Sequence, residues 1–146
     1  MIDELANAGA LPTLEAVMRF AGERQRLIAH NIANWTTPNF QPKDVSVKDF
    51  QASLAEAVDA RRARTGGTHG ELEWGGTREV RRNSGGGLEL RPDTGVGSLL
   101  RHDRNSMDLE RTMQDMVENA SAYRVAADFL RQQQSQLRAA ISERVV

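Results

Sequence analysis

Apolar side chains recur at alternating spacings of three and four residues in two long segments, one toward each end of the chain. This spacing places them along one face of an α-helix, so it predicts two long helices. The first helix is expected to end before Pro38, and the second is expected to run from Asp108 to Glu143. The two apolar faces, called here the predicted seam, comprise Leu14, Met18, Ala21, Ile28, Ile32, Leu109, Met113, Met116, Ala120, Tyr123, Ala127, Leu130, Leu137 and Ile141. We expect them to pair as a coiled-coil-like hairpin.

The second helix is too long for an ordinary small domain. At 1.5 Å per residue it would extend about 54 Å, whereas a domain of this size is only about 30 Å across. It must therefore protrude, or pack in an extended assembly.

Both helices also carry residues that lie well away from the predicted seam when residues are placed at about 100° intervals. This second set comprises Phe20, Leu27, Asn31 and Asn34 in the first helix and Val125 and Phe129 in the second. One interpretation is ordinary scattered exposure of apolar groups. The other is that several hairpins pack side by side, so that neighbouring subunits cover these residues.

The middle of the chain is different in character. Thr37 to Pro42 predicts a turn, and Ser46 to about Arg64 predicts a shorter helix in which Ser46 and Asp49 form a weak capping box. Ten of the 12 glycines lie between Gly66 and Gly97. This segment offers two short strands at most, Thr77–Val80 and Leu88–Leu90, and is expected to be mobile unless a partner covers it.

The predicted fold class is therefore mainly α, with a glycine-rich middle that is weakly β or disordered. We divide the chain into the N-terminal helix at 1–38, a turn and short helix at 39–64, the glycine-rich segment at 65–100 and the C-terminal helix at 101–146.

Composition removes several classes of function. The 146 residues include no cysteine, which excludes disulfides and thiolate metal sites, and 19 Lys and Arg balance 20 Asp and Glu. The near-zero charge gives no general attraction to nucleic acid. His30, His69 and His102 fall in three different segments, and no phosphate-binding loop or nucleophile elbow is present. We expect no enzyme activity, metal, cofactor, nucleic acid or small-molecule substrate.

One stretch is recognisable. Ala29-His30-Asn31-Ile32-Ala33-Asn34, followed by Thr37-Pro38-Asn39-Phe40, resembles the N-terminal signature of the bacterial flagellar rod and hook protein family. Lys43 to Phe50 and Asn105 to Glu110 are similar to members that form the proximal part of the rod. The family usually has glycine where this chain has Asn39. The matching residues singled out here are Asn31, Ile32, Ala33, Asn34, Thr37, Pro38, Phe40 and Asp44.

The resemblance implies a structural subunit of the flagellar basal body. Such a chain would be exported unfolded from the cytoplasm by the flagellar type III apparatus, without a cleaved signal. It would then polymerise through its terminal helices in the periplasmic rod and serve motility. Implied partners are further copies of the chain, other rod proteins, the rod–ring adaptor protein, the membrane-ring base and the export apparatus.

Two alternatives remain beside this interpretation: another flagellar rod subunit, or a cytoplasmic coiled-coil adaptor that forms discrete oligomers. Within the rod interpretation, Asn31 and Asn34 are expected to hydrogen-bond between neighbouring helices and so fix their register. The simpler alternative is that Asn34 caps the end of the first helix.

Overall fold

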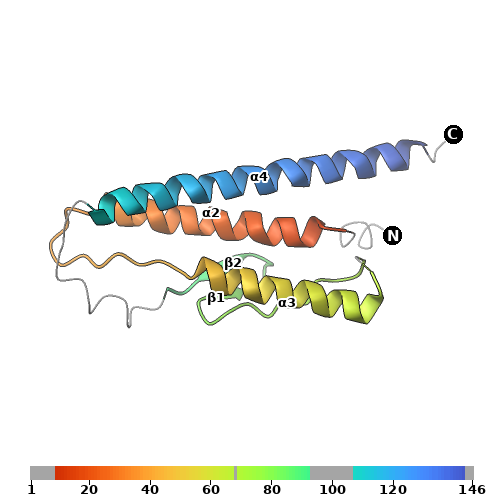
Figure 1. The fold of residues 1–146 in the computed structure, drawn as a ribbon, viewed down its shortest axis with the longest axis horizontal. Helices are drawn as coiled ribbons and strands as arrows, with labels where there is room; N and C mark the ends of the chain where they lie inside the picture. Colours follow the sequence, from red (N-terminus) through yellow and green to blue (C-terminus); the bar gives the residue numbers. More distant parts are fainter. Residues whose placement is uncertain (1–8, 68, 93–106, 144–146) are drawn as a thin grey trace.

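The computed structural model describes residues 9–67, 69–92 and 107–143. Within these ranges the order is helix α2 (Leu11–Ala33), helix α3 (Val47–Thr65), strand β1 (Val80–Arg82), strand β2 (Leu88–Leu90) and helix α4 (Met107–Glu143) (Figure 1). The chain is mainly helical, as the sequence predicts. Asn105 and Ser106, which open the Asn105–Glu110 stretch, lie outside the described residues.

Helices α2 and α4 lie side by side and run in opposite directions (Figure 1), which confirms the predicted hairpin of terminal helices. Asn119 of α4 contacts Ala21, and Tyr123 lies over Gly22, where an added Cβ would be 3.7 Å from its ring. Helix α4 has 37 residues against 23 in α2. It therefore continues past the Leu11 end of its partner, as Figure 1 shows.

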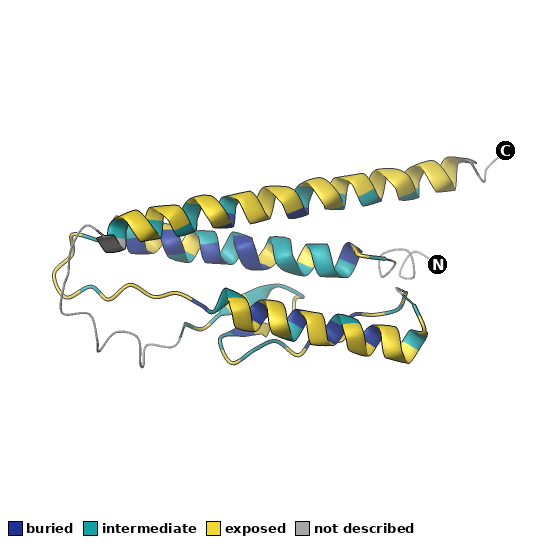
Figure 2. Cartoon of the chain, viewed as in Figure 1, coloured by how far each residue is buried: buried dark blue, intermediate teal, exposed yellow. Residues whose placement is uncertain are grey.

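A second layer covers the other side of α2. It consists of α3 and the small β1–β2 hairpin, so α2 is the central element of the fold (Figure 1). Figure 2 shows the result: α2 carries many buried residues, whereas most of α4 is exposed.

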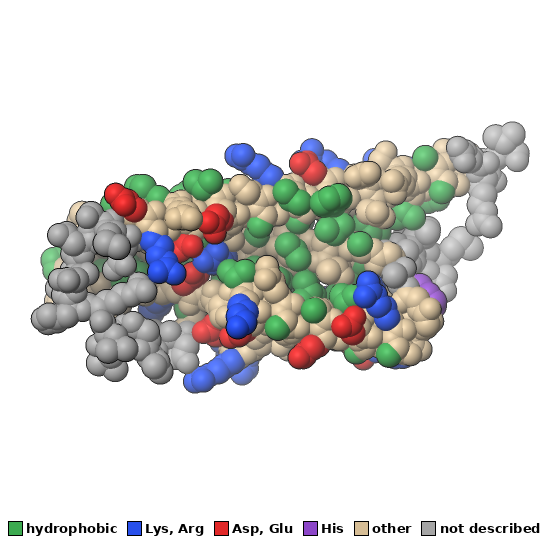
Figure 3. All heavy atoms as spheres, viewed as in Figure 1, with side chains coloured by type: hydrophobic (Ala, Val, Ile, Leu, Met, Phe, Trp, Pro, Cys, Tyr) green, Lys and Arg blue, Asp and Glu red, His purple; other side chains and the backbone are tan. Residues whose placement is uncertain are grey.

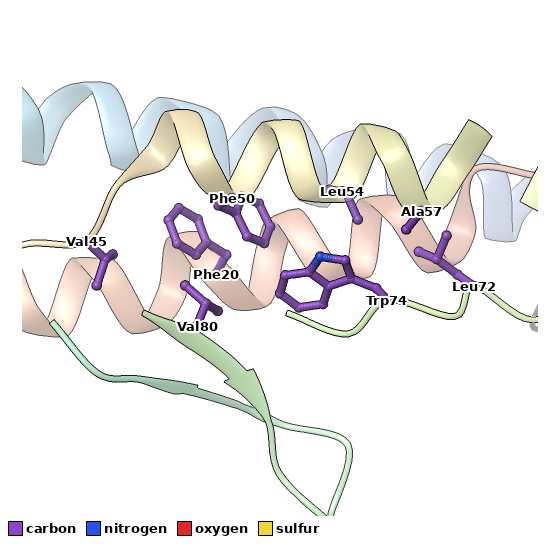
Figure 4. Close-up of a cluster of buried hydrophobic side chains, with 8 residues drawn as sticks. All are labelled: Phe20, Val45, Phe50, Leu54, Ala57, Leu72, Trp74 and Val80. Atoms are coloured by element: carbon purple, nitrogen blue, oxygen red, sulfur yellow. The ribbon is translucent and has the colours of Figure 1, made fainter. Parts of the chain in front are cut away.

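The hydrophobic core lies between α2 and this second layer (Figure 4). Phe50 of α3 stacks on Phe20 of α2 with ring centroids 3.9 Å apart, and its edge-to-face partner Trp74 is 5.3 Å away. The indole Nε1 of Trp74 donates to Ser53 Oγ at 2.9 Å, which satisfies the polar group of a buried ring. The buried residues of this cluster are Phe20, Val45, Phe50, Leu54, Ala57, Leu72, Trp74 and Val80.

The glycine-rich segment thus contributes three residues, Leu72, Trp74 and Val80, to the core. The expectation of a weakly β segment holds, because β1 and β2 pair antiparallel with Val80 opposite Leu90. The first strand begins at Val80 and not at Thr77. The Thr77 hydroxyl accepts from the amides of Glu79 and Val80, and this tight turn precedes the strand.

Local sequence explains where α3 begins and ends. Ser46 caps its start by accepting from the amide of Asp49 at 3.1 Å, as predicted. Gly66 adopts the left-handed conformation with φ 69° at its end, and its amide donates to the carbonyl of Arg62.

Candidate assembly surface

Exposed apolar side chains are concentrated on α4. Among the described residues, the large hydrophobic side chains classed as exposed all belong to this helix: Met113, Val117, Tyr123, Val125, Phe129 and Ile141. Hydrophobic side chains are visible along the α4 edge of the molecule in Figure 3. We call these six residues the α4 apolar surface.

The surface has two separate flanks. At about 100° per residue, Met113 and Val117 form one flank, and Val125 with Phe129 lies about 120° further around the helix. The α2-facing side, marked by the buried Asn119 and Ala126, lies about 90° from the Val125–Phe129 flank and about 150° from the Met113–Val117 flank. Helix α4 therefore presents apolar groups on three sides, and α2 covers one of them.

The predicted seam is displaced on α4. Ala21 and Ile28 of α2 are buried, and Leu14, Met18 and Ile32 are half-buried. On α4, the predicted residues that are half-buried are Leu109, Met116, Ala120, Ala127, Leu130 and Leu137, whereas Met113, Tyr123 and Ile141 are exposed. The helix turns Asn119 and Ala126 toward α2, because Asn119 hydrogen-bonds to that helix.

The second set of residues on α2 is covered by this chain itself. Phe20 is 4 % exposed and stacks on Phe50, while Leu27 packs against the same core. The expectation that neighbouring subunits cover these two residues is therefore wrong for the chain as folded here. Val125 and Phe129 are 54 % and 53 % exposed, so for these two residues the expectation stays a prediction.

Asn31 binds within the chain. Its side chain donates to the carbonyl of Lys43 at 2.6 Å and accepts from the Lys43 amide at 3.1 Å. It thus fixes the connection between α2 and α3, and is not available to set register between neighbouring helices. Asn34 donates to the carbonyl of His30 at 2.9 Å, which is the helix-capping alternative.

The other motif residues shape the turn that follows α2. The amide of Phe40 donates to the carbonyl of Thr37 at 3.2 Å, and Asn39 between them has φ 60°. With Pro38 and a left-handed residue at its two centre positions, this is a type II arrangement. Phe40 packs edge-on against His30 with ring centroids 5.7 Å apart, whereas Ala33, Thr37 and Pro38 are exposed.

Asp44 anchors the same connection through a bidentate ion pair. Arg24 Nε and Nη2 donate to its two carboxylate oxygens at 2.9 and 2.6 Å. Burial by itself lowers the pKa of Arg24, but the hydrogen bonds and charge of Asp44, with weaker attraction from Asp115 and Glu118 of α4, raise it above its ordinary value. Arg24 therefore links α2 to the connection and, electrostatically, to α4.

Comparison with known proteins gives the same family in several organisms. The chain is 26% identical over 144 residues to the flagellar basal body rod protein FlgB of Proteus mirabilis (strain HI4320), an alignment covering 98% of this chain and 99% of that protein. It is 28% identical over 123 residues to the FlgB of Yersinia enterocolitica, with 84% and 85% covered. The FlgB of Borrelia hermsii is 32% identical over 106 residues, 68% of this chain and 71% of its own. The chain belongs to the FlgB family of flagellar basal body rod proteins. No protein-family model and no solved structure matches it.

Membership of the FlgB family confirms the resemblance drawn from the Asn31–Phe40 motif and its continuation. Asn31 and Asp44 hold the α2–α3 connection against α2, and Asn34 ends the helix.

Sequence reasoning missed two contributors to this arrangement, Arg24 and Trp74. Arg24 stands in a polar stretch between Glu23 and Gln25, so the sequence around it does not mark it as buried or as the partner of a distant carboxylate. Asp44 lies 20 residues further on. A single tryptophan among glycines was the available signal for Trp74, since large aromatic side chains are rarely left uncovered without purpose.

The part of this FlgB family member that the structure describes has few features that could bind a small molecule or an ion. An open groove of about 490 Å³ runs between α2 and the hairpin, lined by Glu23, Arg26, Leu27, Asn83, Leu88, Glu89, Leu90 and Pro92. No group of three or more His, Asp or Glu side chains in the described ranges could hold a metal ion. Nor does any helix there combine the length and apolarity of a membrane span.

Proposed function

We propose that the chain is a structural subunit of the proximal part of the flagellar rod and that it polymerises through its terminal helices. The observation that carries the proposal is the α4 apolar surface. Six large apolar side chains are exposed on one helix, and α2 leaves both of its flanks uncovered. Membership of the FlgB family supplies the setting in which such flanks would be covered.

The geometry favours an extended assembly over a closed pair. The two flanks differ in composition and lie about 120° apart, so one copy can present different surfaces to two neighbours. Contacts between unlike surfaces generate rings or helical filaments, depending on whether the rotation closes. The neighbours in this proposal are further copies, other rod proteins, the rod–ring adaptor protein and the membrane-ring base.

We further infer that the chain reaches the periplasmic rod by export through the flagellar type III apparatus. The fold is small, and zero cysteine leaves no disulfide to resist unfolding during export. Disabling the export ATPase should leave the chain in the cytoplasm, as shown by fractionation. An unchanged distribution between cytoplasm and periplasm would contradict this route.

Genetic replacement tests the structural role. A strain lacking the gene is expected to be non-motile and to yield basal bodies without rods by electron microscopy. The wild-type gene should restore both. Normal flagella in the deletion strain would overturn the proposal and would favour a cytoplasmic adaptor.

The α4 apolar surface is tested in the same strain with the double variant Val125→Glu and Phe129→Glu. Rods should be absent, because two carboxylates would be buried against a neighbour. Ser135→Glu, which adds one carboxylate at an exposed polar position of α4, should assemble normally. Both purified variants should retain the helical circular dichroism spectrum of the wild type. Normal rods in the double variant would show that this flank is not an interface.

A further inference from the structure

Two of the arginines that the structure describes are buried, and their side chains have very different partners. Arg24 on α2 is 8 % exposed and makes the bidentate pair with Asp44. Arg61 on α3 is only 2 % exposed, yet among the described residues no carboxylate pairs with it.

The guanidinium of Arg61 is also incompletely hydrogen-bonded. Its Nη2 donates to the carbonyl of Gly9 at 2.9 Å, but Nε and Nη1 have no hydrogen-bond partner in the part of the chain that the structure describes. An arginine side chain is not deprotonated in proteins, so it keeps its charge when it is buried. A buried charge without a counter-ion costs free energy, and replacing it with an apolar side chain is often stabilising.

The position of Arg61 makes this cost local. It lies near the C-terminal end of α3, and its single side-chain hydrogen bond joins that end to the residues just before α2. Separating α3 from α2 would return the guanidinium to water and would break only one hydrogen bond made by that group. The α2–α4 pair does not involve Arg61, so the cost falls on the second layer alone.

We propose that Arg61 is a weak point built into the fold, which lets the layer formed by α3 and the β1–β2 hairpin separate from α2 when the chain is unfolded for export. The inference rests on the proposed export of the chain. Export requires the folded state to open. With a buried charge that has no counter-ion among the described residues, this layer opens at lower cost than the same layer would with an apolar side chain at position 61.

Amide hydrogen exchange on the purified chain tests whether Arg61 weakens the packing of the second layer against α2. In Arg61→Met and Arg61→Gln, the amides of α3 should exchange about tenfold more slowly than in the wild type. Amides in the centre of α2 and α4 should change less. Arg62→Met is the matched control, because Arg62 is exposed on the same helix and pairs with Asp59 at 3.4 Å. Its exchange should match the wild type.

Export of the same variants completes the test. In the deletion strain, Arg61→Met should leave a larger cytoplasmic fraction than the wild type or Arg62→Met. If neither Arg61 variant slows exchange, the charge is compensated and the proposal is wrong. If exchange slows but export is unchanged, Arg61 does not act on export and the proposal is equally wrong. Failure of the wild-type chain to be exported would instead overturn the proposed route, and this inference with it.

Discussion

Asn119 of α4 donates a hydrogen bond to the backbone carbonyl of Ala21 in α2, at 2.7 Å. The same amide group also donates to the side-chain oxygen of Gln25 at 2.8 Å. Asn119 is 5 % exposed, so both bonds are shielded from water. A polar side chain thereby fixes which face of α4 meets α2.

Replacing Asn119 with alanine should destabilise the isolated chain by about 1–3 kcal/mol, because the carbonyl of Ala21 and the side-chain oxygen of the half-buried Gln25 would both lose a donor. Asn119→Asp should cost more, since a carboxylate would oppose a carbonyl oxygen. Urea denaturation followed by circular dichroism measures both. Gln132→Ala, an exposed position on the same helix, should change stability by less than about 0.5 kcal/mol. An Asn119→Ala variant as stable as this control would contradict the role assigned to the bond.

The same bond explains why the sequence predicts the pairing of the helices but not its rotation. Met116 and Leu130 lie toward α2 both in the predicted rotation of α4 about its axis and in the observed one. The apolar spacing therefore predicts the hairpin correctly. The remaining positions are ambiguous: hydrophobicity favours Met113, whereas the structure turns Asn119 inward. A pattern that counts only apolar residues cannot reveal a buried side-chain amide whose partner is a backbone carbonyl.

The turn after α2 is also testable, because Asn39 is the only non-glycine residue with positive φ in the described ranges. Asn39→Ala should cost about 1 kcal/mol, since asparagine tolerates the left-handed conformation better than alanine. Asn39→Gly should be within about 0.5 kcal/mol of the wild type or slightly more stable, because relief of strain and added unfolded-state entropy oppose each other. Thermal melting distinguishes the two, and Gln41→Ala serves as an exposed neighbour. A loss in the glycine variant as large as that in the alanine variant would show that the Asn39 side chain itself is needed.

A double-mutant cycle measures the Arg24–Asp44 pair. Arg24→Ala and Asp44→Ala should each destabilise the chain, and together they should cost less than the sum, with a coupling of about 1–2 kcal/mol. The expected value is moderate because the Asp44 side chain is 42% exposed, although that of Arg24 is only 9%. Arg24→Lys should recover part of the stability, since it keeps the charge but not the two-pronged geometry. Strict additivity in the cycle would show that the pair contributes nothing beyond its separate parts.

The second layer shows a different limit of sequence reasoning. The cap at Ser46 and the helix that follows are local features, and both were predictable. Leu72 and Trp74 enter the core from irregular backbone, and Val80 enters it from the first position of β1. Leu72 and Trp74 alternate with Glu71 and Glu73, but so short an alternation does not indicate which surface the two residues cover, so their contact with the core around Phe20 could not be anticipated. Without this cover, the sequence alone suggests that neighbouring subunits contact Phe20 and Leu27.

Two phenylalanines separate the contribution of this core from that of the assembly surface. Phe50 is 1 % exposed between Phe20 and Trp74, so Phe50→Ala should destabilise the chain by about 3–5 kcal/mol. Phe129 is 53 % exposed, and Phe129→Ala should change the stability of the purified chain by less than about 0.5 kcal/mol. With Trp35 replaced by Phe, the fluorescence of Trp74 reports on the second layer directly. Its emission should shift to longer wavelength in Phe50→Ala and should stay unchanged in Phe129→Ala. Comparable stability of the two variants would mean that the layer over α2 is only loosely held and that the core drawn in Figure 4 does not stabilise the chain.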